Sequence, residues 1–131
     1  MPTLTPTRRG RCADMGDWQP QYQALRMTAR EAAELIRDGD VLAFAAMANW
    51  PWELDSALAE RLLKTGGHVA IHGHFIPAGT RLLTPELAGQ VTYDSNFYGV
   101  ERSLAPMGNV RFVPTNLSQT VDWLRSRKPR V

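Results

Sequence analysis

The sequence has few of the features that mark secreted, membrane-bound or nucleic-acid-binding proteins. Its 131 residues include one cysteine, Cys12, so no disulfide can form within the chain. No apolar run approaches the ~18 residues that a membrane-spanning helix needs, so no membrane association is expected. No apolar run follows Arg8 and Arg9, as it would in a secretory or twin-arginine signal, and the cytoplasm is the expected location.

Charge of one sign is also scarce, because the formal net charge is only +2. The basic residues gather near the two chain ends, where charged side chains are usually solvated. No aromatic residues are interleaved with them to stack on bases, so nucleic-acid binding is not expected.

The chain lacks a clear metal-binding motif. His68, His72 and His74 would project from one face of an extended segment, and imidazole is a common zinc ligand. A zinc site needs a further ligand and outer partners, and nothing in the pattern supports Asp94 or Glu101 in that role. We therefore predict no metal and interpret the histidines as surface or pocket residues.

A catalytic nucleophile is not predicted either. No G-x-S-x-G elbow surrounds Ser95 and no base is identifiable, so a turn formed by Ser95 and Asn96 is the better interpretation. Asp38 and Asp40 flank Gly39, and we predict that their carboxylates accept backbone N–H bonds in the turn that follows a helix. No residue of this chain is predicted to be catalytic.

What is present is the composition of a single domain, with 44% apolar and 21% charged residues. Residues 1–21 are polar, basic and interrupted by prolines, and we predict a flexible segment whose end Trp18 and Tyr22 could anchor. Residues 22–131 are predicted to form an α/β domain with an open, mostly parallel sheet flanked by helices on both faces. The sheet is expected to be incomplete at its C-terminal edge, which favours a partner.

Helices and strands are predicted to alternate along this domain. A capping box of Thr28 and Glu31 opens the first helix, and Pro51 lies in the first turn of the second, which ends at Gly66. Continuous apolar runs predict strands that are covered on both faces. The predicted strands are residues 41–46, 68–75, 90–98 and 110–113, with a short helical piece near residue 86 and a last helix from residue 118.

The spacing of apolar residues also predicts which helix faces are buried. In the first helix the inner face is expected to carry Ala32, Leu35 and Ile36. In the last helix it is expected to carry Val121 and Leu124.

A loop of small residues follows the first predicted strand. A substrate could approach its backbone, and N–H groups at the start of the next helix could face an anion. Open α/β sheets place ligands at such loops, at the carboxyl ends of strands. The simpler alternative is that the alanines only let a helix pack tightly on the sheet. The candidate residues are Ala45, Ala46, Met47, Ala48, Asn49 and Pro51.

Five segments, in order, resemble motifs of one known family. Residues 28–40 look like its opening helix and I-x-x-G-D turn, and residues 44–51 match the length of its F-G-x-x-x-G-x-P loop. The other three segments are residues 85–89, 95–99 and 111–118. From residue 22 to about residue 125 the chain therefore resembles the N-terminal half of the acetyl-CoA hydrolase/transferase family, which includes the acetate-dependent CoA-transferases.

The resemblance implies a CoA-transferase-like N-terminal domain of an enzyme that moves CoA between an acyl-CoA and a small carboxylate such as acetate. In the family the reaction passes through a glutamyl-CoA thioester, and the nucleophilic glutamate lies in a C-terminal domain. This chain alone is therefore expected to be inactive and to need a complementary C-terminal domain or partner chain. The resemblance adds Asn96 to the candidate loop as part of the CoA pocket. No bound cofactor is expected, since the coenzyme A thioester is the substrate.

Two positions depart from the family pattern, because Ala45 and Asn49 stand where the family loop has glycines. Glycine allows φ > 0 and the closest approach of a ligand to the backbone, so both residues would change the shape of the loop. The alternative function is therefore a non-catalytic interaction subunit or a truncated relative. Trp50 and Trp52, on either side of Pro51, could cover core, line the pocket or form a subunit contact.

Overall fold

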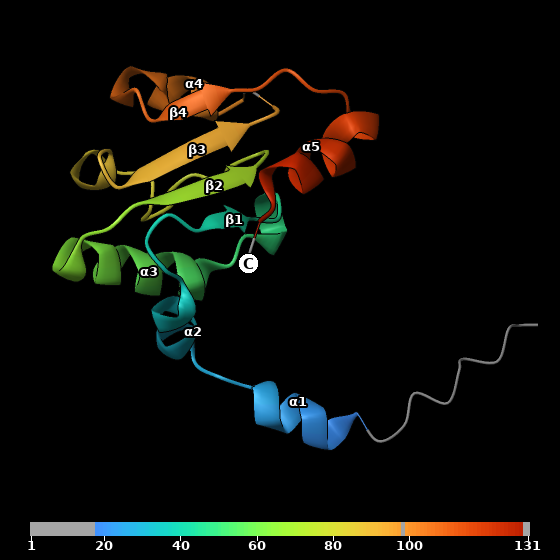
Figure 1. Cartoon of the computed structure of the whole chain (residues 1–131). Helices are drawn as coiled ribbons and strands as arrows, with labels where there is room; N and C mark the ends of the chain where they lie inside the picture. The colour runs from blue at the N-terminus through green and yellow to red at the C-terminus, as the bar shows by residue number, and fades with distance from the viewer. Residues whose placement is uncertain (1–17, 98, 130–131) are drawn as a thin grey trace, which may run out of the picture.

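Four parallel strands form the centre of the computed structural model, which describes residues 18–97 and 99–129 (Figure 1). All four predicted strands form, and each is shorter than its predicted range. The strand order follows the chain, so all four carboxyl ends lie at one edge of the sheet. The predicted open α/β class is confirmed. The strands are β1 (Val41–Ala43), β2 (Val69–Gly73), β3 (Val91–Ser95) and β4 (Val110–Phe112).

The pairing register separates the two faces of the sheet. One row of paired residues crosses all four strands and is buried throughout: Leu42, Ile71, Tyr93 and Val110. Side chains alternate along a strand, so the neighbouring row points to the opposite face: Ala43, His72, Asp94 and Arg111. The first face carries the apolar core, whereas the second is polar or small.

Helix α3 (Trp52–Thr65) covers the apolar face. Its buried residues include Leu58 and Leu62, as their spacing predicts, and the helix ends at Gly66 with φ +73°. Helix α2 (Ala29–Leu35) packs on α3. The connection between β2 and β3 contains the 3-10 turn η2 (Pro85–Leu87) and adds buried apolar residues to the same core: Ile76, Leu82, Leu83 and Leu87.

The remaining elements lie at the ends of the strands and of the chain. They are α1 (Gln19–Leu25), η1 (Met47–Asn49), α4 (Glu101–Leu104), η3 (Ala105–Met107), η4 (Leu117–Gln119) and α5 (Thr120–Arg127). Among the described residues, no helix is both long enough and apolar enough to span a membrane.

Two local signals of the sequence act as predicted. Thr28 Oγ1 accepts the Glu31 N–H at 3.2 Å, and the Glu31 carboxylate accepts the Thr28 N–H at 2.7 Å, so the capping box is complete. These bonds hold the pKa of Glu31 below its usual value. In the turn around Gly39, Asp38 accepts the His68 N–H at 2.6 Å and Asp40 accepts the Arg37 N–H at 2.7 Å.

Two predicted helix faces were wrong in part. In α2, Leu35 is 56% exposed, and Ala33 is buried in its place beside Ile36. The helix has only seven residues, so its packing against α3, and not a long apolar stripe, selects the buried side. In α5, Val121 is 55% exposed, and Trp123 makes the contact with the sheet.

Helix α5 lies over the polar face, near the carboxyl ends of the strands (Figure 1). The ring of Trp123 packs edge-on against the ring of His72, with 4.9 Å between the ring centroids. The Arg127 guanidinium lies 3.9 Å from the Asp94 carboxylate. Helices were predicted on both faces of the sheet, and within the described residues α5 is the helix on this second face. The outer edge of β4, expected to be incomplete, pairs with no further strand in the described chain.

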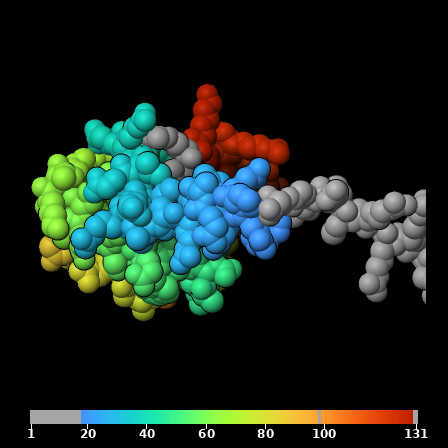
Figure 2. Space-filling model, turned by 90° about the horizontal axis from the view of Figure 1, so that it is seen from below, coloured from blue at the N-terminus to red at the C-terminus, as the bar shows by residue number. Residues whose placement is uncertain are grey.

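Helix α1 lies on the outside of the molecule together with α2, as the view from below shows (Figure 2). None of its residues is buried, and Trp18 and Tyr22 contact each other at 6.0 Å instead of anchoring to the core. The helix crosses the predicted boundary between residues 21 and 22. The rest of the predicted flexible basic segment, residues 1–17 with Cys12, lies outside the described residues.

Candidate functional site

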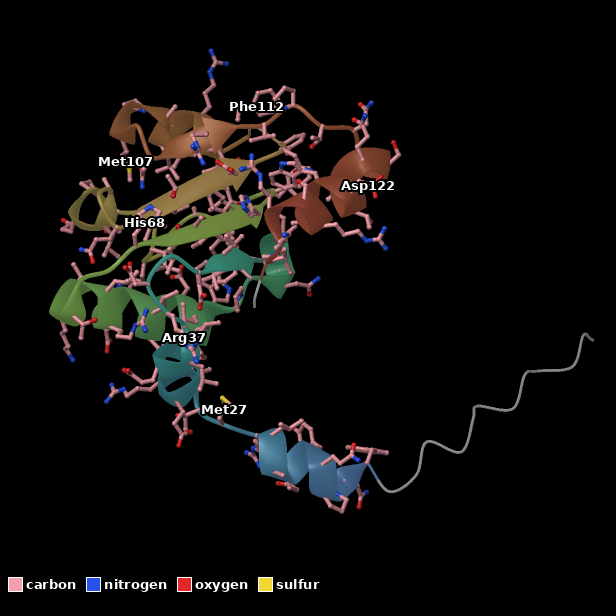
Figure 3. The ribbon with its side chains drawn as sticks, in the orientation of Figure 1. Met27, Arg37, His68, Met107, Phe112 and Asp122 are labelled. Carbon is pink, nitrogen blue, oxygen red and sulfur yellow. The ribbon has the colours of Figure 1, made fainter. Side chains whose placement is uncertain are left out.

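The carboxyl ends of the four strands bring four connections together at one edge of the sheet. These are η1 after β1, residues 74–76 after β2, residues 96 and 97 after β3, and residues 113–119 after β4. Figure 3 shows Phe112 at this edge, whereas His68 and Met107 lie at the opposite edge. Ligands of open parallel sheets bind at this edge because the loops here, and not the strands, vary in shape.

Backbone hydrogen bonds hold each connection to the neighbouring connection or to the end of the neighbouring strand. The Met47 N–H donates to the Phe75 carbonyl at 3.1 Å, which ties the first connection to the second. The Asn96 N–H donates to the Gly73 carbonyl at 3.3 Å, and the Val113 N–H donates to the Ser95 carbonyl at 2.8 Å. The four connections therefore form one continuous surface.

The predicted loop lies on this surface and is open to solvent. Ala45, Ala48 and Asn49 are exposed, while Ala46 and Pro51 are half-buried. Met47 is 54% exposed and has φ +50°, a left-handed conformation that favours glycine. Pro51 is the residue before α3 and not part of its first turn.

The two tryptophans beside Pro51 have different roles. Trp50 is 3% exposed, and its ring packs edge-on against Phe44 at 5.0 Å and lies 6.3 Å from Tyr93. It is therefore a core residue. Trp52 is 43% exposed on the first turn of α3, so it is free to line a pocket or meet a subunit.

Two adjoining hollows lie beside the predicted loop, at the ends of β3 and β4. The larger, of about 340 Å³, is lined by His74, Phe75, Asn96, Phe97, Thr115, Asn116 and Leu117. The smaller, of about 250 Å³, is lined by Asn96, Phe112, Pro114, Thr115, Asn116 and Gln119. Of the predicted site residues, only Asn96 lines these two hollows; residues 45–51 lie outside both.

Aromatic and amide side chains give the larger hollow its chemistry. The rings of Phe75 and Phe97 are stacked, with 3.8 Å between their centroids and an angle of 24° between their planes. Asn96 donates through Nδ2 to Thr120 Oγ1 at 3.2 Å, so its amide is fixed in orientation. The hollow thus offers an apolar wall beside polar groups, the usual lining of a small-molecule site. Sequence reasoning missed Phe75 and Phe97, because both fell inside the predicted strands 68–75 and 90–98, whereas each observed strand ends two residues before its phenylalanine.

Ser95 has the carboxylate partner that the sequence did not reveal. Its hydroxyl lies 3.0 Å from Glu101 Oε1 and 2.5 Å from the Phe97 carbonyl oxygen. Ser95 and Glu101 are both fully buried, so a substrate cannot reach the pair. The interpretation of Ser95 as a structural residue is supported.

The polar face of the sheet carries a second group of charges. His72 and Asp94 are almost fully buried, and His72 Nδ1 lies 3.4 Å from Asp94 Oδ2. The Arg111 Nε donates to Asp94 Oδ1 at 2.7 Å, and Arg127 lies beyond the other oxygen. Burial lowers the pKa of His72 below its usual value; the Asp94 charge opposes this, and both arginines add to it.

The three histidines do not form a metal site. The His68 ring bonds to Thr92 Oγ1 at 2.9 Å, His72 faces Asp94, and His74 lies beside Phe75. In residues 18–97 and 99–129, no group of three or more histidine, cysteine, aspartate or glutamate side chains is arranged to hold a metal ion.

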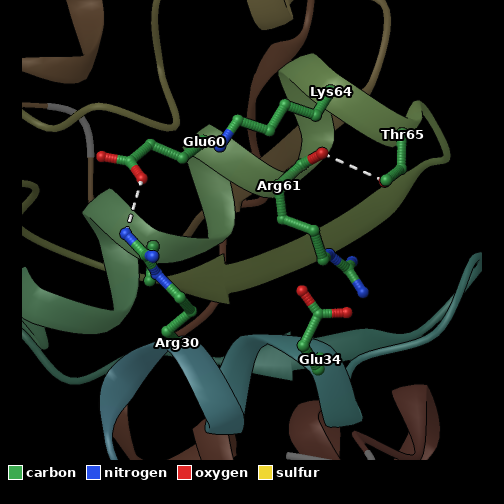
Figure 4. Close-up of a pocket in the computed structure, with 7 residues that line it drawn as sticks. Arg30, Glu34, Glu60, Arg61, Lys64 and Thr65 are labelled. Carbon is green, nitrogen blue, oxygen red and sulfur yellow. Dashed lines mark hydrogen bonds and ion pairs between the residues drawn. The ribbon is translucent and has the colours of Figure 1, made fainter.

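A further shallow hollow of about 120 Å³ lies between α2 and α3 (Figure 4). Its walls are mainly charged, and Arg30 pairs with Glu60 at 3.6 Å across it. Lys64 and Thr65, at its rim, belong to the end of α3 that leads into the amino end of β2. The hollow is thus distant from the carboxyl edge of the sheet, and exposed ion pairs of this kind are common on solvated surfaces.

A scan of protein-family models and a search of curated proteins each give no match to this chain. Solved structures do match it. RipA from Yersinia pestis superposes with a TM-score of 0.72 at 28% identity, over 80% of this chain and 27% of that one. Two RipA point mutants give TM-scores of 0.72 and 0.78 at 28% and 26% identity, over 80% and 87% of this chain. This chain spans less than a third of the length of those structures, since it covers 26% to 29% of them.

Proposed function

We propose that this chain is the N-terminal part, or a separate subunit, of a CoA-transferase or acyl-CoA hydrolase. In this proposal CoA moves between an acyl-CoA and a small carboxylate such as acetate, in the cytoplasm. The observation that carries the proposal is the convergence of four connections and two hollows at the carboxyl edge of a parallel sheet, where the resemblance to CoA-transferases places the thioester.

The chemistry assigns this chain a binding role. A carboxylate nucleophile attacks the thioester carbonyl, and oriented N–H groups stabilise the oxyanion that develops. In the described residues, no exposed carboxylate lines either hollow at this edge, so a complementary C-terminal domain or partner chain would bring the nucleophile. The loop of residues 45–51, together with Asn96, would form the wall that faces it.

The length of the similar structures supports the proposal of a complementary domain. This chain superposes on 26% to 29% of each RipA chain, so those proteins combine a domain like this one with a larger remainder. A complementary domain of this kind would cover the ligand edge and enclose the thioester.

A non-catalytic interaction subunit is the second candidate, and the exposed apolar side chains of the edge favour it. Within the described chain five of them lie on or next to the four connections and are 37% to 78% exposed: Met47, Phe75, Phe97, Phe112 and Leu117. Exposed apolar side chains that gather on one part of a surface are typical of a protein–protein contact.

The test is an exchange assay on the isolated complex. We would tag the chain, purify it from its host, identify the co-purified protein by mass spectrometry, and follow transfer of CoA from acetyl-CoA to isotopically labelled acetate. A complex that exchanges label, and that forms a borohydride-sensitive glutamyl-CoA thioester on the partner, supports the enzyme.

Two variants separate the candidates. Phe97→Ala removes one ring of the stack at the ligand edge, and Leu63→Ala removes an exposed apolar side chain on the outer side of α3 as a matched control. The enzyme predicts that Phe97→Ala weakens exchange while Leu63→Ala does not. A stable complex with no exchange and no acetyl-CoA binding, which Phe97→Ala dissociates, would reject the enzyme in favour of the interaction subunit.

A further inference from the structure

Glu101 is a charged residue buried at the ligand edge. It is 0% exposed and begins α4, a helix of four residues between β3 and β4. Burying a carboxylate is unfavourable unless hydrogen bonds replace the water that it loses, so its contacts must be specific.

Both oxygens of this carboxylate accept hydrogen bonds. Oε1 accepts the Ile76 N–H at 3.1 Å and lies 3.0 Å from the Ser95 hydroxyl, while Oε2 accepts the Gly99 N–H at 3.0 Å. Ile76 belongs to the connection after β2, whereas Ser95 and Gly99 belong to the end of β3 and the connection after it. One side chain therefore fixes two connections, and it lies 25 residues after Ile76, its donor in the first of them.

The residues that Glu101 fixes adjoin the larger hollow. Phe75 precedes Ile76, and Asn96 and Phe97 lie between Ser95 and Gly99. Phe75, Asn96 and Phe97 all line that hollow, and the two phenylalanine rings stack across from one connection to the other. The position of the aromatic stack therefore depends on the bonds that Glu101 accepts.

The chain around Glu101 is adapted to this contact. A Cβ added at Gly99 would lie 3.1 Å from the Phe97 ring and 3.5 Å from Glu101 Oε2, so glycine leaves room for both. The charge also acts on the core, since burial and, next to it, the Glu101 carboxylate raise the pKa of Tyr93.

A nucleophilic role for Glu101 does not fit this geometry. A carboxylate that attacks a thioester needs an oxygen open to the substrate, but both oxygens of Glu101 are engaged and buried. Neutral glutamine cannot replace it, because its NH₂ group would face either the Gly99 N–H or the Ile76 N–H, and two donors would then oppose each other.

We infer that Glu101 is a positioning residue, whose carboxylate sets the connections after β2 and β3 and thereby the Phe75–Phe97 wall of the ligand site. The identity of the ligand, a CoA thioester, rests on the proposed function. The hydrogen-bonding role of Glu101 stands on the contacts alone.

The experiment compares Glu101→Gln and Glu101→Asp with the unmodified chain. Glu34→Gln is the matched control, because Glu34 is exposed on α2 near the other edge of the sheet. Amide hydrogen exchange at Ile76 and Gly99 and the ring-current shifts of Phe75 and Phe97, both measured by NMR, report the connections. Titration with acetyl-CoA reports the site, and circular dichroism reports the fold.

In Glu101→Gln, exchange at Ile76 and Gly99 should rise by about tenfold or more, because a bond to a buried charge is stronger than one to a neutral group. The phenylalanine shifts should move toward random-coil values, and acetyl-CoA should bind more weakly. Glu101→Asp keeps the charge but is one methylene shorter, so it should fold and show a smaller change of the same kind.

Unchanged exchange and ring-current shifts in both variants would overturn the inference, as would altered connections that bind acetyl-CoA as before. If the unmodified chain and its complex bind no acetyl-CoA while the variants still loosen the connections, the proposed function fails and the positioning role of Glu101 stands. If Glu101→Gln does not fold, Glu101→Asp decides the result.

Discussion

The close approach of Gly73 to Tyr93 permits a quantitative test of how the core is packed. A Cβ built on Gly73 would lie 2.7 Å from the Tyr93 hydroxyl oxygen and 3.1 Å from the Phe44 carbonyl oxygen. Tyr93 is 0% exposed, so its ring has no room to move away. Among the described residues, the Tyr93 hydroxyl also finds no hydrogen-bond partner of ordinary geometry. Gly73→Ala should therefore destabilise the fold, mainly through the contact with the Tyr93 hydroxyl.

The expected size follows from two opposing effects. Forcing an extra methyl into a filled core costs about 1–3 kcal/mol, whereas alanine is favoured over glycine within a strand by roughly 0.5–1 kcal/mol. The net loss for Gly73→Ala is thus about 0–2.5 kcal/mol. Tyr93→Phe removes the contact atom and an unpaired polar group, so alone it should change stability by no more than about 0.5 kcal/mol.

The decisive measurement is a double-mutant cycle by urea denaturation, followed by circular dichroism. In the Tyr93→Phe background the contact with the hydroxyl oxygen is gone while the one with the Phe44 carbonyl oxygen remains, so Gly73→Ala should cost less than it does in the original chain. The coupling free energy between the two sites should then be about 1–2 kcal/mol. Additive effects of the two substitutions would refute the packing described here.

Three further outcomes follow from the same structure. Stability should fall as the pH drops below about 6.5, because burial lowers the pKa of His72 and the folded state then binds fewer protons than the unfolded one; His72→Gln should flatten the urea-denaturation curve against pH in that range. Trp50→Ala should cost about 3–5 kcal/mol in the same assay, whereas Trp52→Ala should stay within about 0.5 kcal/mol because Trp52 is exposed. Thr28→Ala should cost about 1 kcal/mol, since it removes the cap of α2, and thermal melting would show the loss.

Signals that act over a few residues were read correctly from the sequence. The capping box at Thr28 and the bond from the Arg37 N–H to Asp40 join residues three apart, and the leucines of α3 recur at every turn of one helix. Apolar runs located all four strands, because a parallel sheet buries its strands. The end of β1 was misplaced by three residues, since the alanines that continue the apolar run pass into the loop.

Features that depend on distant contacts were not predictable. The exposure of Leu35 follows from where α3 packs on α2, and the contact of Trp123 with His72 follows from the path of the chain after β4. Neither partner has a fixed spacing in the sequence, so periodicity alone could not select Ala33 or Trp123.

The candidate site shows the same limit. Strands that run parallel place their following loops together, so the predicted loop and Asn96 lie at one edge of the sheet, and a ligand at that edge stays a prediction. The hollows, however, are lined by residues from three separate connections. Their lining includes Asn96 and its neighbours but none of residues 45–51. Glu101 could not be assigned from sequence, since its donors come from two different connections.

The strand order has a consequence for how the chain can fold during its synthesis. In the part of the chain that the structure describes, each strand after β1 pairs with the one made just before it, and no later strand inserts between two earlier ones. A nascent chain can therefore add one strand at a time to a growing sheet as it leaves the ribosome, because the partner of each new strand has already been made. Each intermediate exposes two edges, one on β1 and one on the newest strand, and in the described sheet both edge strands, β1 and β4, have only three residues that could pair with another chain.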